Sequence, residues 1–369
     1  MRAWVFAALL LGGACGSGHG KSDGPTGPLE AHGDTAGGSA DEWLDVVGTH
    51  IVRHSDGSHF HGRGADLHDE RSCEACSFMA ADPAGVDRWS DELIDNWHAS
   101  FIRFLLSAKS APFNASEVQW KSLVDDPQYL ADIVQNVTHM TSKPGVYVEV
   151  TVFMDPSMKP ENTDPDSEWP SSAGDTLPVY RALAEAFHDN PRVLFGLTNE
   201  PHGPANQDAA LAAVYTTAIQ AIRQVEDSHG TPHHIIVAQA PEGYARDLTY
   251  FIANPLAGDR IIYEVHPYNT AAEFDGLVTQ PAKHLPIMIG EYGPAGTMTN
   301  TDIQALWPVA QAAEVPYIAW VFHQRCPPSM LQDTGGSNYD GCGLDAATGY
   351  NFPRTAWGDL LHDHLATPW

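Results

Sequence analysis

The stretch Asn199-Glu200-Pro201 places a carboxylate directly after the apolar run 193–198. A proline after Glu200 ends a strand, because proline has no N–H to give to a hydrogen-bond ladder. It also favours an extended backbone for Glu200 itself. We therefore expect the carboxylate to be held stiffly at the mouth of a buried strand, where it can exchange a proton with one atom of a ligand.

A second carboxylate occupies a similar place. Glu291 follows the apolar run 286–290, and the glycines on either side of it, Gly290 and Gly293, let a ligand approach the backbone. Two carboxyl groups from separate strands suit the cleavage of a glycosidic bond. One of them protonates the leaving oxygen, while the other attacks the anomeric carbon or activates a water molecule.

Other side chains that suit a sugar-binding site stand in or after further apolar runs: Arg103, Asn199, His266, Tyr268 and Trp320. The indole of Trp320 can stack on the C–H face of a sugar ring, and the amide of Asn199 can hold a ring hydroxyl. Arg103 lies inside the run 101–106, and a buried cation needs a carboxylate partner nearby.

Two further glutamates, Glu149 and Glu264, lie inside strand-like runs. We expect their carboxyl groups to be hydrogen-bonded in the interior or on the wall of a pocket. Glu242 follows the run 234–239 and is expected on the pocket rim. None of the three is expected to belong to the reacting pair.

Short apolar runs recur along the chain, and longer segments with helical spacing lie between them. The runs cover residues 60–66, 101–106, 146–153, 193–198, 234–239, 260–265, 286–290 and 316–322. The segments in which apolar residues return at three and four positions include 86–100, 179–190, 209–228 and 301–314. Alternating strands and helices imply parallel strands joined by right-handed crossovers. Eight strands favour an α/β fold that closes as a single-domain (β/α)8 TIM barrel, in which reacting groups come from the carboxyl ends of the strands.

A doubly wound open sheet is the alternative to the barrel, but no Gly-rich phosphate-binding motif follows the first run.

The start of the chain has the features of an export signal. Residues 1–15 have a charged start, a short apolar core and small residues before Cys15, which is typical of an export signal and too short to span a bilayer. The segment resembles a bacterial lipoprotein signal, so Cys15 is the expected lipid attachment site. Ordinary cleavage and secretion is the alternative.

Residues 16–40 are rich in Gly, Ser, Pro, Asp and Thr, so we expect a flexible tether there and the catalytic domain in residues 41–369. The protein is expected to be exported, either to the bacterial cell surface or outer membrane as a lipoprotein or into the medium.

The net charge of −28 argues against nucleic acid and anionic membranes as partners, because phosphate binding needs clustered Lys and Arg. We expect a monomer that acts on a neutral polysaccharide or oligosaccharide and meets a membrane only through its lipid.

Four cysteines remain when the lipidated one is set aside: Cys73, Cys76, Cys326 and Cys342. Export favours disulfides, and four cysteines allow three pairings. We favour Cys73–Cys76 and Cys326–Cys342, because each pair closes a local loop. Pairing across the two loops stays open, since the loops after the first and last strands of a closed barrel are neighbours.

Histidines gather just before the first cysteine pair: His50, His54, His59, His61 and His68. Imidazole and thiolate are usual zinc ligands. However, the Cys73-x-x-Cys76 pair lacks a second half at standard spacing, and carboxylates alone can carry out both steps of glycoside cleavage. We therefore expect no metal and no organic cofactor, with a zinc-dependent hydrolase as an alternative.

From about residue 44 to the C-terminus, the sequence resembles glycoside hydrolase family 5, the endoglucanase- and mannanase-like family of the retaining (β/α)8 enzymes. The segment 199–201 matches the acid/base motif of that family, and the segment 289–293 matches its nucleophile motif. The family also has an arginine in strand two, a histidine and a tyrosine after strand six, and a tryptophan in strand eight. These are matched by Arg103, His266, Tyr268 and Trp320.

The resemblance implies roles for these residues. Glu291 would be the nucleophile and Glu200 the acid/base in a double displacement on a β-linked glucan, mannan or related glycoside. Their carboxyl groups would lie about 5–5.5 Å apart. Glu200 would hold a proton near neutral pH, while Arg103 and Tyr268 would keep Glu291 ionised.

One position departs from the family pattern. The family carries a histidine at the end of strand three, where this sequence has Phe153, Met154 and Asp155. The departure indicates a divergent subfamily and leaves the sugar and the linkage open. A non-catalytic surface lipoprotein that binds carbohydrate on a barrel scaffold is the alternative to an enzyme, and the intact carboxylate pair counts against it.

Overall fold

The computed structural model describes residues 42–69, 82–107, 122–154, 176–201, 208–240, 244–333 and 352–369. Contacts divide the chain into two compact units, Met1–Thr35 and Ala36–Trp369, and every described residue belongs to the second. The predicted export signal and tether therefore lie outside the described residues. None of the described helices has the length and apolar character that crossing a bilayer requires.

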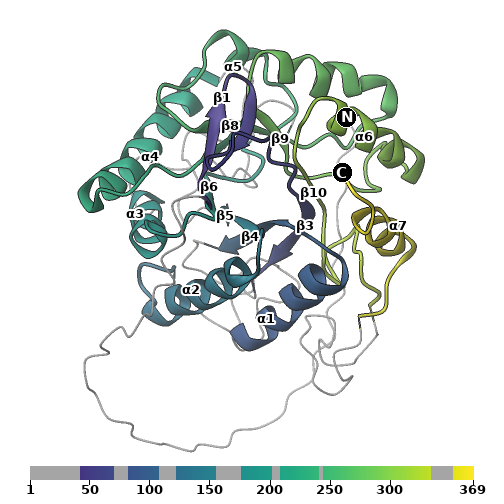
Figure 1. Cartoon of the computed structure of the whole chain (residues 1–369), viewed down its shortest axis with the longest axis horizontal. Helices are drawn as coiled ribbons and strands as arrows, with labels where there is room; N and C mark the ends of the chain where they lie inside the picture. Colours follow the sequence, from purple (N-terminus) through teal and green to yellow (C-terminus); the bar gives the residue numbers. More distant parts are fainter. Residues whose placement is uncertain are drawn as a thin grey trace, which may run out of the picture. The chain divides into compact units, whose positions relative to one another are not determined.

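Eight strands close into a barrel, which confirms the (β/α)8 fold predicted from the sequence (Figure 1). In chain order they are β3 (Arg63–His68), β4 (Phe101–Ser107), β5 (Tyr147–Met154), β6 (Val193–Gly196), β7 (Ile236–Gln239), β8 (Ile261–Val265), β9 (Ile287–Ile289) and β10 (Tyr317–Ala319). Neighbouring strands pair in parallel. The last strand, β10, pairs with both β9 and β3 and so closes the barrel.

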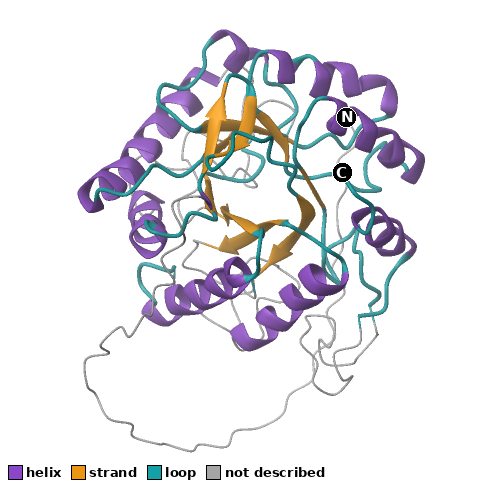
Figure 2. Ribbon diagram, viewed as in Figure 1, coloured by secondary structure: helices purple, strands orange, loops and turns teal. Residues whose placement is uncertain are grey.

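Helices surround the strands (Figure 2). They are α1 (Pro83–Asp91), α2 (Pro127–Ser142), α3 (Thr176–Phe187), α4 (Asp208–His229), α5 (Thr249–Ala253), α6 (Asn300–Ala312) and α7 (Ala356–Leu365). Short helical turns follow α1 and β8: η3 (Glu92–Asn96), η4 (Ala271–Glu273), η5 (Asp275–Thr279) and η6 (Pro281–Lys283). Helical spacing predicted α1, α3, α4 and α6 but not α2, α5 and α7. The start of α2 was nevertheless signalled, because Asp126 caps it and Pro127 occupies its first turn.

An antiparallel hairpin precedes the barrel and was not predicted from the sequence. Its strands are β1 (Leu44–Val47) and β2 (His50–Arg53), which are too short to show a clear alternation. Leu44 and Ile51 of the hairpin share a buried apolar cluster with Phe101 and Tyr147, the first residues of β4 and β5. The hairpin therefore covers the amino end of the barrel and leaves the carboxyl end free for a site.

Strand residues alternate between the helix layer and the barrel interior. On β4, Ile102 and Phe104 pack in the core between strands and helices, whereas Phe101 belongs to the cluster inside the barrel. Arg103 has the same parity as Phe101 and faces inward. The same alternation on β3, β5 and β8 turns three carboxylates inward beside Arg103. The side chains of this interior charged layer are at most 1% exposed, and they are Asp66, Arg103, Glu149 and Glu264.

Gly290 makes room for this charged layer. A Cβ atom at this position would lie 1.5 Å from Oε1 of Glu264, which is far inside van der Waals contact. The sequence interpretation assigned Gly290 to the approach of a ligand. In the structure the Glu264 carboxylate occupies the space that a side chain at position 290 would fill.

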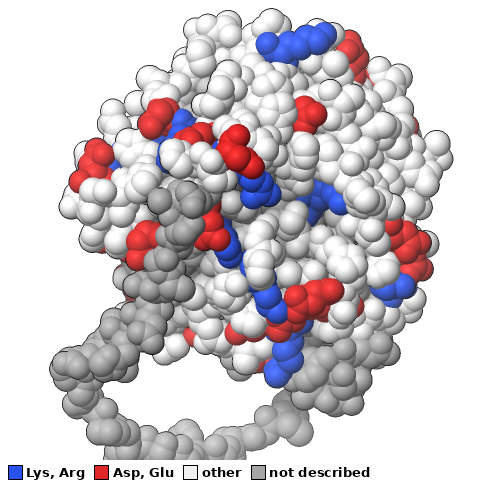
Figure 3. Space-filling model, in the orientation of Figure 1, with Lys and Arg blue, Asp and Glu red and all other residues white. Residues whose placement is uncertain are grey.

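The surface carries intermixed charges. On the face shown in Figure 3, Lys and Arg side chains lie next to Asp and Glu side chains, and the described residues form no broad basic area on that face. Among the described residues, Lys143 is paired with two carboxylates, since its ammonium group lies 2.7 Å from Asp91 and 2.6 Å from Asp95.

Candidate active site

Glu200 and Glu291 lie at the carboxyl end of the barrel, after β6 and β9. One carboxylate oxygen of each and a ring nitrogen of His266 lie within 4.8 Å of one another. The nearest carboxylate oxygens of Glu200 and Glu291 are thus no more than 4.8 Å apart. The fold therefore brings together two carboxyl groups that come from strands on different sides of the barrel.

Both oxygens of Glu291 are held by hydrogen bonds. Arg103 donates from Nη1 to Oε1 over 2.8 Å, and the Tyr268 hydroxyl donates to Oε2 over 3.0 Å. The side chain of Glu291 is 6% exposed, whereas that of Glu200 is 24% exposed. The structure thus places Arg103 and Tyr268 where the sequence analysis expected them and fixes the direction of the Glu291 carboxylate.

Arg103 has more acidic neighbours than the single partner that its burial required. Its Nη1 also donates to Asp66 over 3.1 Å, and its Nε lies 3.0 Å from Glu264. Its Nη2 donates to Oδ1 of Asn199 over 2.8 Å, which leaves the Asn199 NH₂ group for other acceptors. Burial would lower the pKa of Arg103, but the surrounding carboxylates raise it well above its usual value. The guanidinium is therefore a permanent charge at the centre of the interior layer.

The His266 ring lies between Glu200 of the reacting pair and Glu264 of the interior charged layer. Its Nδ1 lies 2.8 Å from Glu200 Oε1, and its Nε2 lies 2.9 Å from Glu264 Oε1. Burial would lower the pKa of His266, but the carboxylates of Glu291, Glu200 and Glu264 raise it to about 10. At neutral pH the ring therefore carries a proton on both nitrogens and can donate to both neighbours.

The pKa of Glu291 lies above its usual value. Burial raises the pKa of Glu291, and the Glu200 carboxylate adds to this, while His266 and Arg103 oppose the shift without reversing it. Arg103 thus favours the ionised form of Glu291, as expected from the sequence, although burial opposes it. Closing the barrel removes water from Glu291 and places other carboxylates beside it, and these effects exceed the attraction of the cations.

The interior glutamates Glu149 and Glu264 have opposite pKa shifts. Burial raises the pKa of Glu149 to about 8, and the Glu264 carboxylate adds to the shift. Burial also acts on Glu264, but Arg103 and a hydrogen bond from His266 outweigh it and lower its pKa. At neutral pH Glu149 is therefore mainly protonated, and Glu264 is ionised. Both are interior groups, as the sequence predicted.

Replacing Glu149 with glutamine is expected to stabilise the fold as the pH rises, because glutamine resembles the protonated acid. The folded-state pKa of Glu149 lies above its ordinary value of 4.5, so the wild type loses stability between about pH 4.5 and about pH 8. The Glu149→Gln variant avoids that loss. Thermal unfolding should show a gain in Tm that grows with pH to roughly 2–4 °C.

Glu264→Gln is the matched control for this experiment. It removes an ionised partner of Arg103 and His266, so its Tm should fall by several degrees across the same pH range. A deficit for Glu149→Gln that grows with pH would contradict the assignment of the proton to Glu149.

The backbone of Glu200 also departs from the prediction. Its φ is +40°, in the left-handed region, and not the extended value expected before Pro201. The N–H of Glu200 donates to Gln239 Oε1 over 2.6 Å, and Gln239 in turn donates to Glu264 Oε2 over 2.7 Å. The side chain of Gln239 thus supports the turn that directs Glu200 towards His266. Sequence reasoning missed Gln239, although it ends the run that became β7.

Trp320 lies beside Phe153, the residue found where the family resemblance predicts histidine. The two rings are nearly parallel, with an interplanar angle of 22° and centroids 5.9 Å apart. His68 stands edge-on to both rings, with its centroid 5.3 Å from each. Burial and the nearby His323 hold the pKa of His68 well below its usual value, so this ring is neutral. The three rings form an aromatic wall at the carboxyl end of the barrel.

The histidines that precede Cys73 in the sequence do not lie together in the structure but are divided between the two ends of the barrel. His68 ends β3, whereas His59 and His61 precede that strand. His54 directly follows the hairpin strand β2, and its ring lies 2.5 Å from Asp45 of the same hairpin. Zinc ligation by these histidines together as one group is therefore not supported.

Several predicted residues lie outside the described residues: Cys15, Cys73, Cys76, Asp155, Glu242 and Cys342. Cys326 is described and is disulfide-bonded. The two favoured pairings, Cys73–Cys76 and Cys326–Cys342, stay predictions.

The comparisons with known proteins point to one family. A family model described as "Cellulase (glycosyl hydrolase family 5)" matches residues 87–325. The mannan endo-1,4-beta-mannosidase of Streptomyces lividans is 29% identical over 181 residues, which cover 46% of this chain and 42% of the mannosidase. The match therefore spans less than half of that relative.

Solved structures share the fold. The beta-glucanase of Saccharophagus degradans aligns with a TM-score of 0.68 at 18% identity, over 92% of this chain and 97% of the glucanase. The catalytic domain of a mannanase from Streptomyces sp. SirexAA-E aligns with a TM-score of 0.60 at 19% identity, over 90% of this chain and 93% of the mannanase. At these identities the likeness establishes the barrel architecture.

Proposed function

Because the chain belongs to glycosyl hydrolase family 5, we propose that it cleaves the β-linked backbone of a mannan or β-glucan by double displacement. Glu291 acts as the nucleophile and Glu200 as the acid/base. The observation that carries this proposal is the pair of carboxylates, which lie within 4.8 Å of His266 and of each other at the carboxyl end of the barrel. The names of the similar mannosidase and beta-glucanase favour these two substrate classes.

In the first step, an oxygen of Glu291 forms a bond to the anomeric carbon while the bond from that carbon to the leaving oxygen breaks. Glu200 gives its proton to the leaving oxygen. The hydrogen bonds from Arg103 and Tyr268 support this role, because they orient the Glu291 carboxylate as a fixed nucleophile.

In the second step, a water molecule gives a proton to Glu200 and attacks the same carbon, which frees the Glu291 carboxylate. Two inversions at one carbon restore the β configuration. The greater exposure of Glu200, at 24% against 6% for Glu291, supports its assignment as the group that exchanges protons with the leaving sugar and with water.

His266 suits a reaction in which negative charge moves from one carboxylate to the other. Its Nδ1 lies 2.8 Å from Glu200 and 3.6 Å from Glu291. When Glu291 becomes an ester, Glu200 has become an anion beside the same imidazolium. The cation thus stabilises both charge distributions and needs no rearrangement between them.

A panel of substrates tests the proposal. Purified protein is incubated with mannan, glucomannan, mixed-linkage β-glucan and cellulose, and the release of reducing sugar is measured. We expect release from at least one of them, and NMR should show the β-anomer as the first product. An α-anomer would contradict double displacement, and binding without sugar release would favour the non-catalytic alternative.

A further inference from the structure

Two histidines and a glutamate meet at the amino end of the barrel. His59 and His61 precede β3, and Glu314 lies between α6 and β10. One nitrogen or oxygen of each side chain lies within 4.8 Å of the other two. All the barrel strands are parallel, so this group lies at the end opposite to Glu200 and Glu291. It is therefore separate from the site of the proposed hydrolysis.

The spacing of the two histidines turns both imidazoles to one side. Residues two apart in an extended segment share a face, and His59 forms a β-bridge with Val52 of the hairpin. Phe60 between them points the other way, into the buried cluster inside the barrel, and is 1% exposed. The side chains of His59, His61 and Glu314 are 36–37% exposed, so an ion can reach them from solvent.

The geometry suits a tetrahedral ion. Ligands that each lie about 2.0–2.2 Å from a tetrahedral zinc are separated by about 3.3–3.6 Å. His59 Nδ1 lies 3.3 Å from Glu314 Oε2. His61 Nε2 makes a direct hydrogen bond to the same oxygen, and a bound ion would replace that bond.

Each imidazole is backed by a second ring. His50 stacks on His59 with centroids 4.4 Å apart and an interplanar angle of 14°. Trp369 stacks on His61 with centroids 4.4 Å apart and an angle of 2°. Stacking restricts the rotation of both imidazoles, and ligands that are already oriented lose less freedom when an ion binds.

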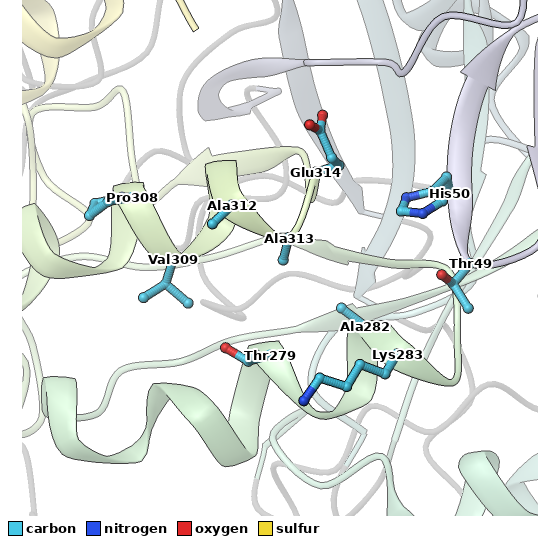
Figure 4. A pocket seen from close by; sticks show the side chains of 10 residues that line it. All are labelled: Thr49, His50, Thr279, Ala282, Lys283, Pro308, Val309, Ala312, Ala313 and Glu314. Carbon is cyan, nitrogen blue, oxygen red and sulfur yellow. The ribbon is translucent and has the colours of Figure 1, made fainter.

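A pocket of about 540 Å³ opens beside this group and is lined by Glu314, His50, Thr49 and Lys283 among others. In Figure 4 the His50 ring extends towards the side of the pocket where Glu314 lies, while the amine of Lys283 points away from Glu314.

We propose that His59, His61 and Glu314 bind one Zn²⁺ ion, with a water molecule as the fourth ligand. Two imidazoles and one carboxylate are a ligand set that zinc accepts in tetrahedral geometry. The ion joins the segments that lead into β3 and β10, which are the first and last strands and pair with each other where the barrel closes. Its role is to stabilise that closure, and it takes no part in the hydrolysis.

Zinc binding is measured on the full chain under non-reducing conditions, after dialysis against a chelator and re-equilibration with zinc chloride. The wild type should hold one more equivalent of zinc, measured by inductively coupled plasma mass spectrometry, than the variant His59→Ala/His61→Ala. Any zinc bound by Glu200, His266 and Glu291 is common to both proteins and cancels in the difference. At about 100 times the Kd, zinc should raise the Tm of the wild type by about 4 °C more than that of the variant.

Two further variants make the result decisive. Glu314→Gln keeps the shape of the side chain and should also lose the extra equivalent of zinc. His54→Ala, which removes a histidine paired with Asp45 on the same hairpin, should bind zinc like the wild type. The chelator should leave kcat unchanged within twofold. Equal zinc content in the wild type and in Glu314→Gln, or an equal rise in Tm, would overturn the proposed site without bearing on the roles of Glu200 and Glu291.

Discussion

Replacing Glu291 with glutamine is expected to lower kcat by roughly 10⁵-fold or more, because the variant has no carboxylate to form the glycosyl-enzyme. Glutamine has nearly the same shape, and its amide oxygen can still accept the hydrogen bond from Arg103. The loss should therefore appear in turnover while the fold and the binding of substrate are kept. Steady-state kinetics on an aryl β-glycoside measure the loss, and thermal unfolding checks the fold.

Two observations complete the test of Glu291→Gln. Mass spectrometry of the variant mixed with an activated glycoside should show no covalent adduct, and added azide should not restore turnover. A covalent adduct, or activity within about 100-fold of the wild type, would show that another group is the nucleophile.

Replacing Glu200 with alanine is expected to produce a loss that depends on the leaving group. With a polysaccharide the rate should fall by roughly 10²–10⁴-fold, which is the usual contribution of a general acid. A dinitrophenyl glycoside needs little proton help, so its first step should proceed nearly as in the wild type. The second step lacks its base, and the glycosyl-enzyme should accumulate and become visible as a burst of dinitrophenol followed by slow turnover.

Azide separates the roles of the two glutamates. It needs no general base, so it should speed the breakdown of the intermediate in Glu200→Ala and yield a β-glycosyl azide. The same addition to Glu291→Gln should have no effect, and each variant is thus the control for the other. Azide rescue of Glu291→Gln together with none for Glu200→Ala would reverse the roles proposed here.

Much of the fold could be predicted because strand signals are local. Each of the eight runs read from the sequence overlaps one barrel strand, and the run 101–106 differs from β4 by one residue. Buried parallel strands consist of short apolar segments, and these can be recognised without knowing their neighbours. The hairpin β1–β2 was missed because its strands are only partly buried and so lack the continuous apolar run that marks the barrel strands.

The reacting pair could be predicted for the same reason. Glu200 and Glu291 each stand in a short motif directly after an apolar run, and the ends of parallel strands meet at one end of a barrel. Arg103 was singled out because its own strand is apolar, which required an acidic partner. These inferences needed only the sequence next to each residue and a general property of the fold.

Contacts between distant segments could not be predicted. Gln239 supports the backbone of Glu200, and the spacing of 39 residues between them carries no local signal. The pKa of Glu291 rises because burial and other carboxylates act on it together, and their distances depend on how the strands are staggered in the closed barrel. The proposed zinc ligands His61 and Glu314 are 253 residues apart.

The sequence by itself thus determined which segments become strands and which two carboxylates stand at their ends, because both depend on neighbouring residues and on the polarity of each run. Only the tertiary structure decided which carboxylates contact Arg103, which carboxyl groups keep a proton and which side chains meet at the amino end of the barrel. These properties depend on desolvation and on distances between groups from different strands, and such distances exist only once the barrel has closed.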